Sequence, residues 1–258
     1  MSQLNIDQSQ IEAFLLIFIR VGAILMTLPI FGSESLSRRI KIGLVFAVSL
    51  TLFPVVDLSG INFPLGTLTL IPAIVGEIII GAILGLTARL IFAGVQLSGQ
   101  LVGFQMGFAI ARVIDPVTGI QASILSTFEN IVAVLIFLSI NAHHFFFKAI
   151  SSSFQLIPPF GLSLSGNLME LILNLSENMF ILAIKIGAPV IATLLFTNVA
   201  FGIIARTVPQ VHIMIVAFPL QISIGLLFLG LSFPFFSFLL SKEFLGLEKS
   251  IMQILRFM

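Results

Sequence analysis

Hydrophobic positions along the chain gather into six long segments that are separated by short polar stretches. The segments cover roughly residues 11–30, 41–58, 68–95, 124–149, 171–207 and 211–240. About 20 apolar residues are enough for a helix to cross the hydrocarbon core of a bilayer, and every segment approaches or exceeds that length. The pattern therefore predicts an all-α, polytopic membrane protein.

Several of these segments carry a proline well inside their length. Proline lacks a backbone donor and its ring pushes the preceding turn aside, so we expect the helices that contain it to be kinked or split. The fifth segment is the longest, and IGAPV at 186–190 lies in its middle. For this segment we expect a bent helix or a folded-back hairpin. The prolines concerned are Pro72, Pro189, Pro219 and Pro234.

Composition supports a membrane environment and excludes several other classes. Hydrophobic residues make up 58% of the chain and charged residues 9%, against about 25% charged residues in soluble domains. A net charge of +1 gives no basic footprint for a nucleic-acid partner. The chain has no Cys, which excludes a disulfide framework and a thiolate metal site. Partners are therefore expected in the membrane and among proteins.

Five charged residues lie inside the apolar segments: Arg20, Glu77, Arg89, Glu129 and Lys185. Each would cost about 2.5 to 3.5 kcal/mol if it faced lipid near the centre of the bilayer, so most must face protein or water. For Arg20 and Arg89, snorkelling toward the interface remains the alternative. We expect Glu77, Arg89, Glu129 and Lys185 to be buried, with at least one of them paired across helices or subunits.

Glycines recur at four-residue spacing in two places. One pair is Gly81 and Gly85, and the second series is Gly99, Gly103 and Gly107. Residues four apart stay on one helical face, and a face without side chains lets two backbones approach closely. We expect close helix packing at Gly81, Gly85, Gly99 and Gly103, so that a larger side chain there would force helices apart.

The sequence offers little for catalysis. GSES at 32–35 lacks the second glycine of a nucleophile elbow. His143 and His144 are neighbours in sequence, and His212 is distant; adjacent side chains on a helix do not face each other, so the pair is a poor metal site. There is also no glycine-rich phosphate loop with its lysine. We predict no catalytic, metal or cofactor-binding residue, no cofactor, and a protein that is not an enzyme.

A secondary transporter for a small solute is the alternative from another class. Such proteins use broken helices and charges near the bilayer midplane to bind ions and substrates. The chain has no convincing internal repeat, however, and its interrupted segments do not fall at matching places in two halves.

Three stretches together resemble the FliR family of flagellar biosynthetic proteins. They are PIFGSESLSRRIKIGLVFAVSLTLFP (29–54), GEIIIGAILGLTARLIFAGVQLSGQLVGFQMGFAIARVIDP (76–116) and NVAFGIIARTVPQVHIMIVAFPLQISIG (198–225). The motifs are G-x-Q-M-G followed by D-P, and N-x-x-x-G-x-x-x-R-x-x-P-Q followed by F-P-L. Arg112 departs from the family pattern, which has mainly apolar or hydroxyl residues there. The resemblance covers nearly the whole chain.

The resemblance implies a structural subunit of the flagellar type III export gate. Members of the family look like a fusion of a FliP-like fold, here about 1–165, and a FliQ-like fold, here 166–258. They join FliP-like and FliQ-like subunits in a helical assembly of kinked hairpins, together with FlhB-like and FlhA-like export components. Unfolded export substrates pass through its pore. The implied location is the bacterial inner membrane, in the flagellar basal body, with the assembly projecting toward the periplasm. The homologous injectisome subunit is a nearby alternative.

The resemblance also assigns a role to the turn that follows the second glycine series. Residues 104–116 are expected to enter the pore as a loop and plug it, because a narrow apolar constriction excludes water and ions. Without the family, a buried re-entrant turn between helices would be the simpler interpretation. The expected seal comprises Met106, Phe108, Ile110, Val113 and Ile114, and the expected hinges are Gly103, Gly107, Asp115 and Pro116.

Overall fold

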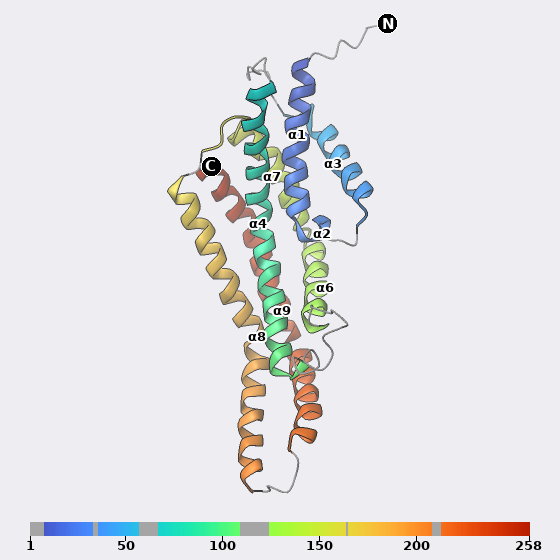
Figure 1. The fold of residues 1–258 in the computed structure, drawn as a ribbon, viewed down its shortest axis with the longest axis vertical. Coiled ribbons are helices and arrows are strands. Elements are labelled where there is room, and N and C mark those ends of the chain that lie inside the picture. The colour runs from blue at the N-terminus through green and yellow to red at the C-terminus, as the bar shows by residue number, and fades with distance from the viewer. Residues whose placement is uncertain (1–7, 33–35, 57–66, 109–123, 164, 208–212) are drawn as a thin grey trace. The chain divides into compact units, whose positions relative to one another are not determined.

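The computed structural model describes residues 8–32, 36–56, 67–108, 124–163, 165–207 and 213–258. The elements in these ranges are helices, with no strand among them (Figure 1), and they confirm an all-α fold. They are α1 (Gln8–Thr27), α2 (Pro29–Gly32), α3 (Arg38–Leu52), α4 (Thr67–Gln105), α6 (Ile124–Ser139), α7 (His143–Leu156), α8 (Gly166–Thr207) and α9 (Ile213–Phe257).

Four of the described helices, α1, α4, α8 and α9, are long and apolar enough to cross a membrane. The pair α6 and α7 would provide a fifth span if the two helices acted as one broken segment. The prediction of a polytopic membrane protein is thereby confirmed. The helix within the second predicted segment, α3, has 15 residues and is shorter than the roughly 20 that a span requires.

The chain folds into two compact units. Unit 1 contains residues 1–90, 141–175 and 244–258, and unit 2 contains residues 91–140 and 176–243. Helices α4, α8 and α9 each contribute residues to both units. This division differs from the boundary expected at residues 165 and 166, and the fusion of a FliP-like with a FliQ-like fold stays a prediction.

The prolines lie inside continuous helices. Pro72 is in α4, Pro189 in α8, and Pro219 and Pro234 in α9. The expected folded-back hairpin in the fifth segment is therefore wrong, because α8 is one helix of 42 residues. A proline removes one hydrogen bond from the ladder, and the turns on either side keep theirs.

Helix boundaries differ from the apolar pattern, as the fourth and sixth segments show. The fourth segment divides into α6 and α7 at Asn141, whose φ of 56° is left-handed and ends the regular helix. The sixth segment continues to Phe257, because buried apolar residues such as Phe244 and Ile251 recur beyond the predicted end at residue 240.

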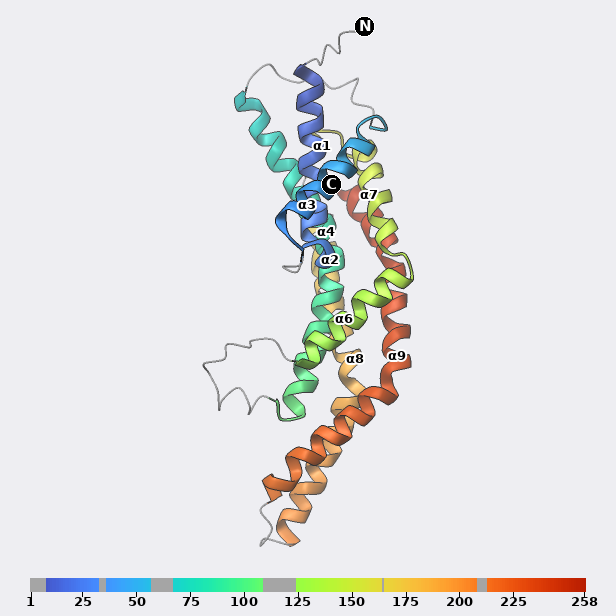
Figure 2. The same ribbon diagram turned by 90° about the vertical axis from the view of Figure 1, so that its right-hand side faces the viewer.

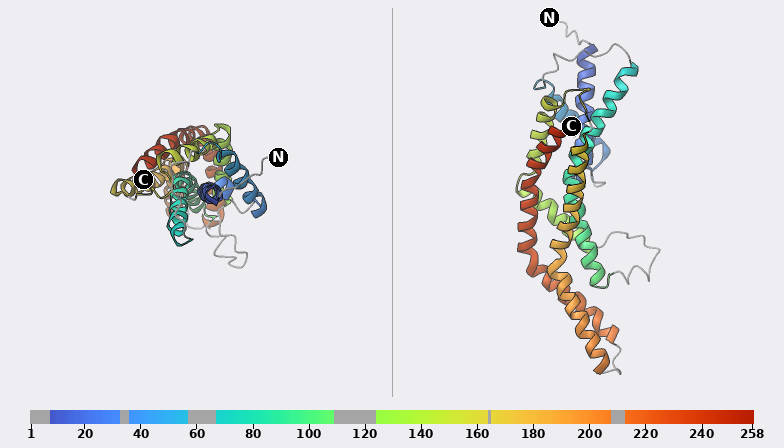
Figure 3. Two further views of the ribbon diagram at one scale, coloured as in Figure 1. Left: turned by 90° about the horizontal axis from the view of Figure 1, so that it is seen from above. Right: turned by 90° about the vertical axis from the view of Figure 1, so that its left-hand side faces the viewer.

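Unit 1 is built around α1, which contacts α2, α3 and α7. Figure 2 shows α3 beside α1, and the view from above in Figure 3 shows α1 along its axis with α3 next to it. Leu16, Ile17 and Ile24 on α1 are fully or almost fully buried. Unit 2 has its own core around Val102 and Leu194. Each unit therefore buries apolar side chains of its own.

Candidate functional site

A buried ion pair joins α1 to α4 in unit 1. The Arg20 guanidinium donates from Nε to Glu77 Oε2 and from Nη2 to Glu77 Oε1 at 2.9 Å. Arg20 is 0% exposed and Glu77 is 1% exposed. The parallel two-bond geometry is the strongest arrangement available to these two groups, and it fixes their relative orientation.

The remaining donors of Arg20 bind the end of α7. Nη1 donates to Ser153 Oγ at 3.3 Å and to the Ile157 carbonyl at 3.0 Å. The Arg20 Cζ lies 4.1 Å from the centre of the Phe154 ring, where the ring face attracts a cation. One side chain therefore ties three helices of unit 1 together, and protein groups compensate its charge.

The glycine pair on α4 lies against α1. A Cβ added to Gly81 would lie 3.0 Å from both Arg20 O and Ile24 N, and one added to Gly85 would lie 2.8 Å from Thr27 Cγ2. These distances are shorter than ordinary van der Waals contacts. The absent side chains let α4 approach α1 closely enough for Glu77 to reach Arg20.

In unit 2, Gly99 lies against the start of α6. A Cβ there would lie 2.5 Å from Ser126 Cα and 2.8 Å from Ser126 N. Ser126 Oγ donates to the Gln96 carbonyl at 3.0 Å and fastens the same contact. Gly103 is buried. The pattern did not single out Gly94, whose added Cβ would lie 2.9 Å from Met179 O on α8, because it stands outside the four-residue series.

Two of the four charges expected to be buried are exposed. Arg89 on α4 and Lys185 on α8 are both exposed on this chain, so their burial against protein stays a prediction that would require a neighbouring subunit. Sequence position shows that a charge lies inside an apolar helix, but the face to which it points depends on how that helix packs. Glu77 and Glu129 are buried.

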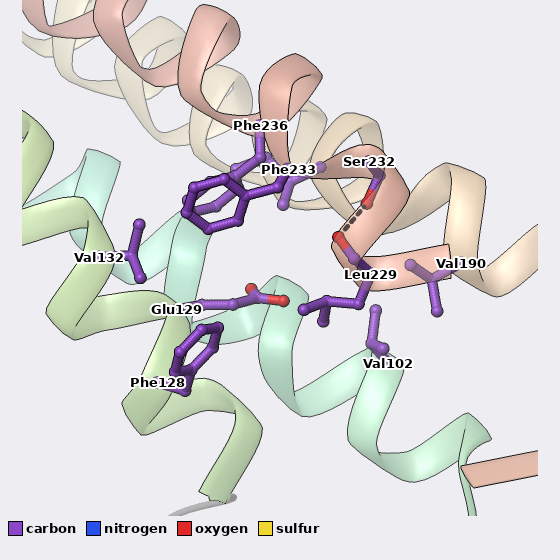
Figure 4. A pocket seen from close by; sticks show the side chains of 10 residues that line it. Val102, Phe128, Glu129, Val132, Val190, Leu229, Ser232, Phe233 and Phe236 are labelled. Carbon is purple, nitrogen blue, oxygen red and sulfur yellow. Dashed lines mark hydrogen bonds between the residues drawn. The ribbon is translucent and has the colours of Figure 1, made fainter. Parts of the chain in front are cut away.

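Glu129 projects from α6 into a small pocket of unit 2 (Figure 4). Its side chain is 6% exposed, and Oε2 has no hydrogen-bond partner among the described residues. The Ser98 hydroxyl lies within hydrogen-bonding reach of this carboxyl and has no other partner among the described residues. The other walls come from α4, α8 and α9, and most are apolar, as with Val102, Val190, Leu229, Phe128, Phe233 and Phe236.

Helix α4 ends beside this core. It runs to Gln105, and Gly107 then adopts a φ of 86° while its N–H donates to the Phe104 carbonyl at 3.1 Å. A left-handed glycine after the last helical residue is a common way to end a helix. Gly107 therefore ends α4, and its role as a hinge stays a prediction.

The structure changes the set of residues available as a plug. Met106 is fully buried in the unit 2 core, where its Cγ would lie 2.8 Å from a Cβ added to Gly225. Phe108 is partly buried and packs on the same core. Met106 is therefore a core side chain here, because Gly225 leaves room for it. The other predicted plug and hinge residues, Ile110, Val113, Ile114, Asp115 and Pro116, lie outside the described residues.

Long apolar stripes are uncovered on three helices. On α8, Phe196 is 72% exposed, and Val199 and Ile203 follow on the same face. A second stripe on α9 comprises Leu231, Phe235 and Phe238, and a third on α3 comprises Ile42, Phe46 and Leu50. Their three- and four-residue spacing places each stripe on one face of its helix. Such contiguous apolar surfaces mark contacts with lipid or protein.

The residue pairings are what sequence reasoning missed. The sequence showed Arg20 as a charge inside a span but did not identify its partner. The opposite charge of Glu77 in another span was the signal that could have indicated the pair. Gln221 Nε2 donates to Asn198 Oδ1 and connects α9 to α8. Both residues stand in the third stretch that resembles the family, but nothing in their spacing predicts the contact.

These features define a class: a polytopic helical membrane protein that buries an ion pair and leaves apolar helix faces uncovered. Residues 11–247 match the family described as bacterial export proteins, family 1. The chain is 37% identical over 223 residues to the flagellar biosynthetic protein FliR of Bacillus subtilis (strain 168), a match that covers 84% of each chain. With FliR of Aquifex aeolicus (strain VF5) it is 30% identical, over 89% of this chain and 88% of the relative. With FliR of Escherichia coli (strain K12) it is 28% identical, over 84% of this chain and 82% of the relative.

The chain therefore belongs to the family of bacterial export proteins, family 1, and the predicted resemblance to FliR is confirmed. Its function is that of a subunit of the flagellar type III protein export gate. It is an inner-membrane component of the flagellum and works with other parts of the export apparatus.

Proposed function

We propose that this chain forms part of the wall of the export pore and that FliP-like and FliQ-like subunits cover its apolar stripes. FlhB-like and FlhA-like components complete the apparatus, and unfolded flagellar proteins pass through the pore. In this proposal the assembly projects from the inner membrane toward the periplasm, within the flagellar basal body. The chain acts as a structural subunit and catalyses no reaction.

The observation that carries the proposal is the combination of helix length and uncovered apolar surface. Helices α4, α8 and α9 have 39, 42 and 45 residues, about twice the number that crosses the hydrocarbon core. Exposed apolar side chains occur along much of α8, from Met169 to Ile204. A bilayer of ordinary thickness covers only part of such a helix. The remainder needs protein neighbours, which supports a multi-subunit assembly.

Co-purification tests this proposal. The affinity-tagged chain should bring down FliP-like and FliQ-like subunits in stable amounts, and Val199→Asp in the α8 stripe should reduce their recovery at equal expression. Glu177→Asp is the matched control, because it changes an exposed residue on α8 that is already charged. A chain that is stable alone as a homo-oligomer, with no export subunit attached, would contradict the assembly.

We also propose that the segment following Gly107 seals the pore. Apolar side chains suit this task because a narrow hydrophobic constriction excludes water and ions yet holds a passing chain weakly. Met106 is left out because it packs in the core, and Phe108 contributes through its packing on that core. In this proposal the seal is Ile110, Val113 and Ile114, between hinges at Gly103, Gly107, Asp115 and Pro116.

A further inference from the structure

The Glu129 pocket in unit 2 combines a buried carboxylate with an unused hydrogen-bonding atom. Glu129 is more than nine-tenths buried, and its Oε2 has no partner among the described residues. An ionised carboxylate only accepts hydrogen bonds, and with the Ser98 hydroxyl beside it Glu129 still has Oε2 free for a further donor. A buried charge without a partner is strongly unfavourable. The ion pair at Arg20 shows that the same chain satisfies a comparable carboxylate fully in unit 1.

The rest of the pocket selects the kind of donor. Ser232 is a polar lining residue, but its hydroxyl already donates to the Leu229 carbonyl at 3.0 Å (Figure 4). Phe128 and Phe233 have exposed rings at the edge of the pocket, 47% and 39% exposed. Their faces attract a cation, and the aliphatic walls suit an apolar stem. The free space holds a water-sized group.

The chain offers no cation for this carboxylate among its described residues. Two ion pairs within the described ranges, Arg20 with Glu77 and Lys148 with Glu248, both lie in unit 1. Lys185 precedes the lining residue Ile186 on α8, but it is exposed, because consecutive side chains on a helix point in different directions.

We propose that this pocket binds the ammonium group of a lysine side chain supplied by a neighbouring subunit of the export gate. The inference rests on the proposed function, since it requires such a neighbour. An ammonium is compact enough for the space, whereas the planar guanidinium of arginine is broader. The lysine stem packs along Val132 and Leu229 while its head reaches Glu129. A charge pair desolvated at an interface fixes the register between two subunits.

Chemical cross-linking in the purified complex tests the contact directly. Dicyclohexylcarbodiimide is apolar and reacts with carboxyls in apolar surroundings at the edge of such a pocket. It condenses a carboxyl with an adjacent amine into an amide while it becomes dicyclohexylurea. We expect peptide mass spectrometry to find Glu129 joined to a lysine of another subunit. The Glu129→Gln complex should lack this product. The cross-link is sought in the wild-type complex, so a folding defect in a variant cannot affect this measurement.

Dissociation of the complex provides the second measurement. Glu129→Gln keeps the shape of the side chain and removes its charge, so subunit dissociation should be at least about tenfold faster than in the wild type. Glu177→Gln, an exposed glutamate in the same unit, should have no effect. Size-exclusion chromatography and circular dichroism of each isolated variant check that it is folded.

Three results would overturn the proposal. In the first, Glu129 carries a carbodiimide adduct without a cross-link, and Glu129→Gln leaves the complex as stable as the wild type. Water or a bound proton would then satisfy the carboxyl. A cross-link to a lipid amine would assign the pocket to a headgroup. If Arg112→Gln destabilised the complex as much as Glu129→Gln and no cross-link formed, the cation would belong to this chain. Failure of the wild-type chain to bind any export subunit would instead contradict the proposed function.

Discussion

Arg20 and Glu77 show how a membrane protein tolerates two charges inside its helices. Taking either charge out of water is expensive, and their attraction offsets the cost only where the geometry is good and the leftover donors are used. Arg20 meets both conditions through Glu77, Ser153 and the Ile157 carbonyl. We therefore expect the pair to act as one unit, so that losing one partner is worse than losing both.

This expectation can be tested with a double-mutant cycle. Arg20→Met and Glu77→Leu should each lower the free energy of unfolding by about 3 to 5 kcal/mol, because each leaves a buried charge alone. The double variant should lose less than either single variant. Denaturing detergent titration in mixed micelles provides the measurement. Lys148→Met serves as control, since the Lys148 side chain is 65% exposed in its ion pair and should cost less than about 1 kcal/mol. Additive losses in the cycle would contradict the coupling.

At this scale the sequence identifies a charged residue more readily than its surroundings. Glu77 and Glu129 stand out as acidic residues within apolar runs, and both are buried. Arg89 and Lys185 stand out equally well, yet both are exposed. The difference depends on which face of a long helix meets a neighbour. Helices α4 and α8 are apolar on most of their circumference, so hydrophobic periodicity does not mark a single inner face.

At the scale of the element, spacing of four between glycines is informative because it describes a face. Gly81 and Gly85 meet α1, and Gly99 meets α6. The break between α6 and α7 had no such signal, since it occurs at Asn141 rather than at a glycine or proline. The prolines split none of the helices that contain them, and a kink at each proline stays a prediction. Sequence therefore predicted helix contacts better than helix ends. A close contact depends on the small size of the residue at that position, whereas a helix end depends on how the surrounding elements pack.

Two glycine-to-alanine variants separate packing from helix propensity. Gly81→Ala places a methyl group against the backbone of α1 and should destabilise unit 1 by about 1 to 3 kcal/mol. Gly246→Ala, in α9 of the same unit, meets open space. It should be neutral or stabilising by up to about 1 kcal/mol, because alanine favours the helix. Unfolding in mixed micelles compares them, and equal effects at the two positions would show that Gly81 is not a contact site.

At the scale of the whole molecule, the apolar stripes make the isolated chain an incomplete structure. The chain has no Cys, so an introduced cysteine is its only thiol. Phe196→Cys and Phe238→Cys should react with N-ethylmaleimide when the chain is alone in detergent and should become protected on assembly with export subunits. Leu194→Cys, at a fully buried position, should be slow in both states. Unchanged labelling on assembly would show that lipid, rather than protein, covers these stripes.

The proposed plug connects the residues that follow Gly107 with a property of the whole gate, its permeability. Residues 110–114 carry three branched apolar side chains around Ala111 and Arg112, and the core contacts of Met106 remain intact if only these five are replaced. A Gly/Ser segment of equal length should leave assembly unchanged and raise ion flux through the gate in proteoliposomes, because it removes the apolar constriction and keeps the connection between helices. Arg112→Gln alone is the control for the lost charge and should keep the membrane tight. If the Gly/Ser variant assembles and ion flux does not rise, the seal is formed by other residues.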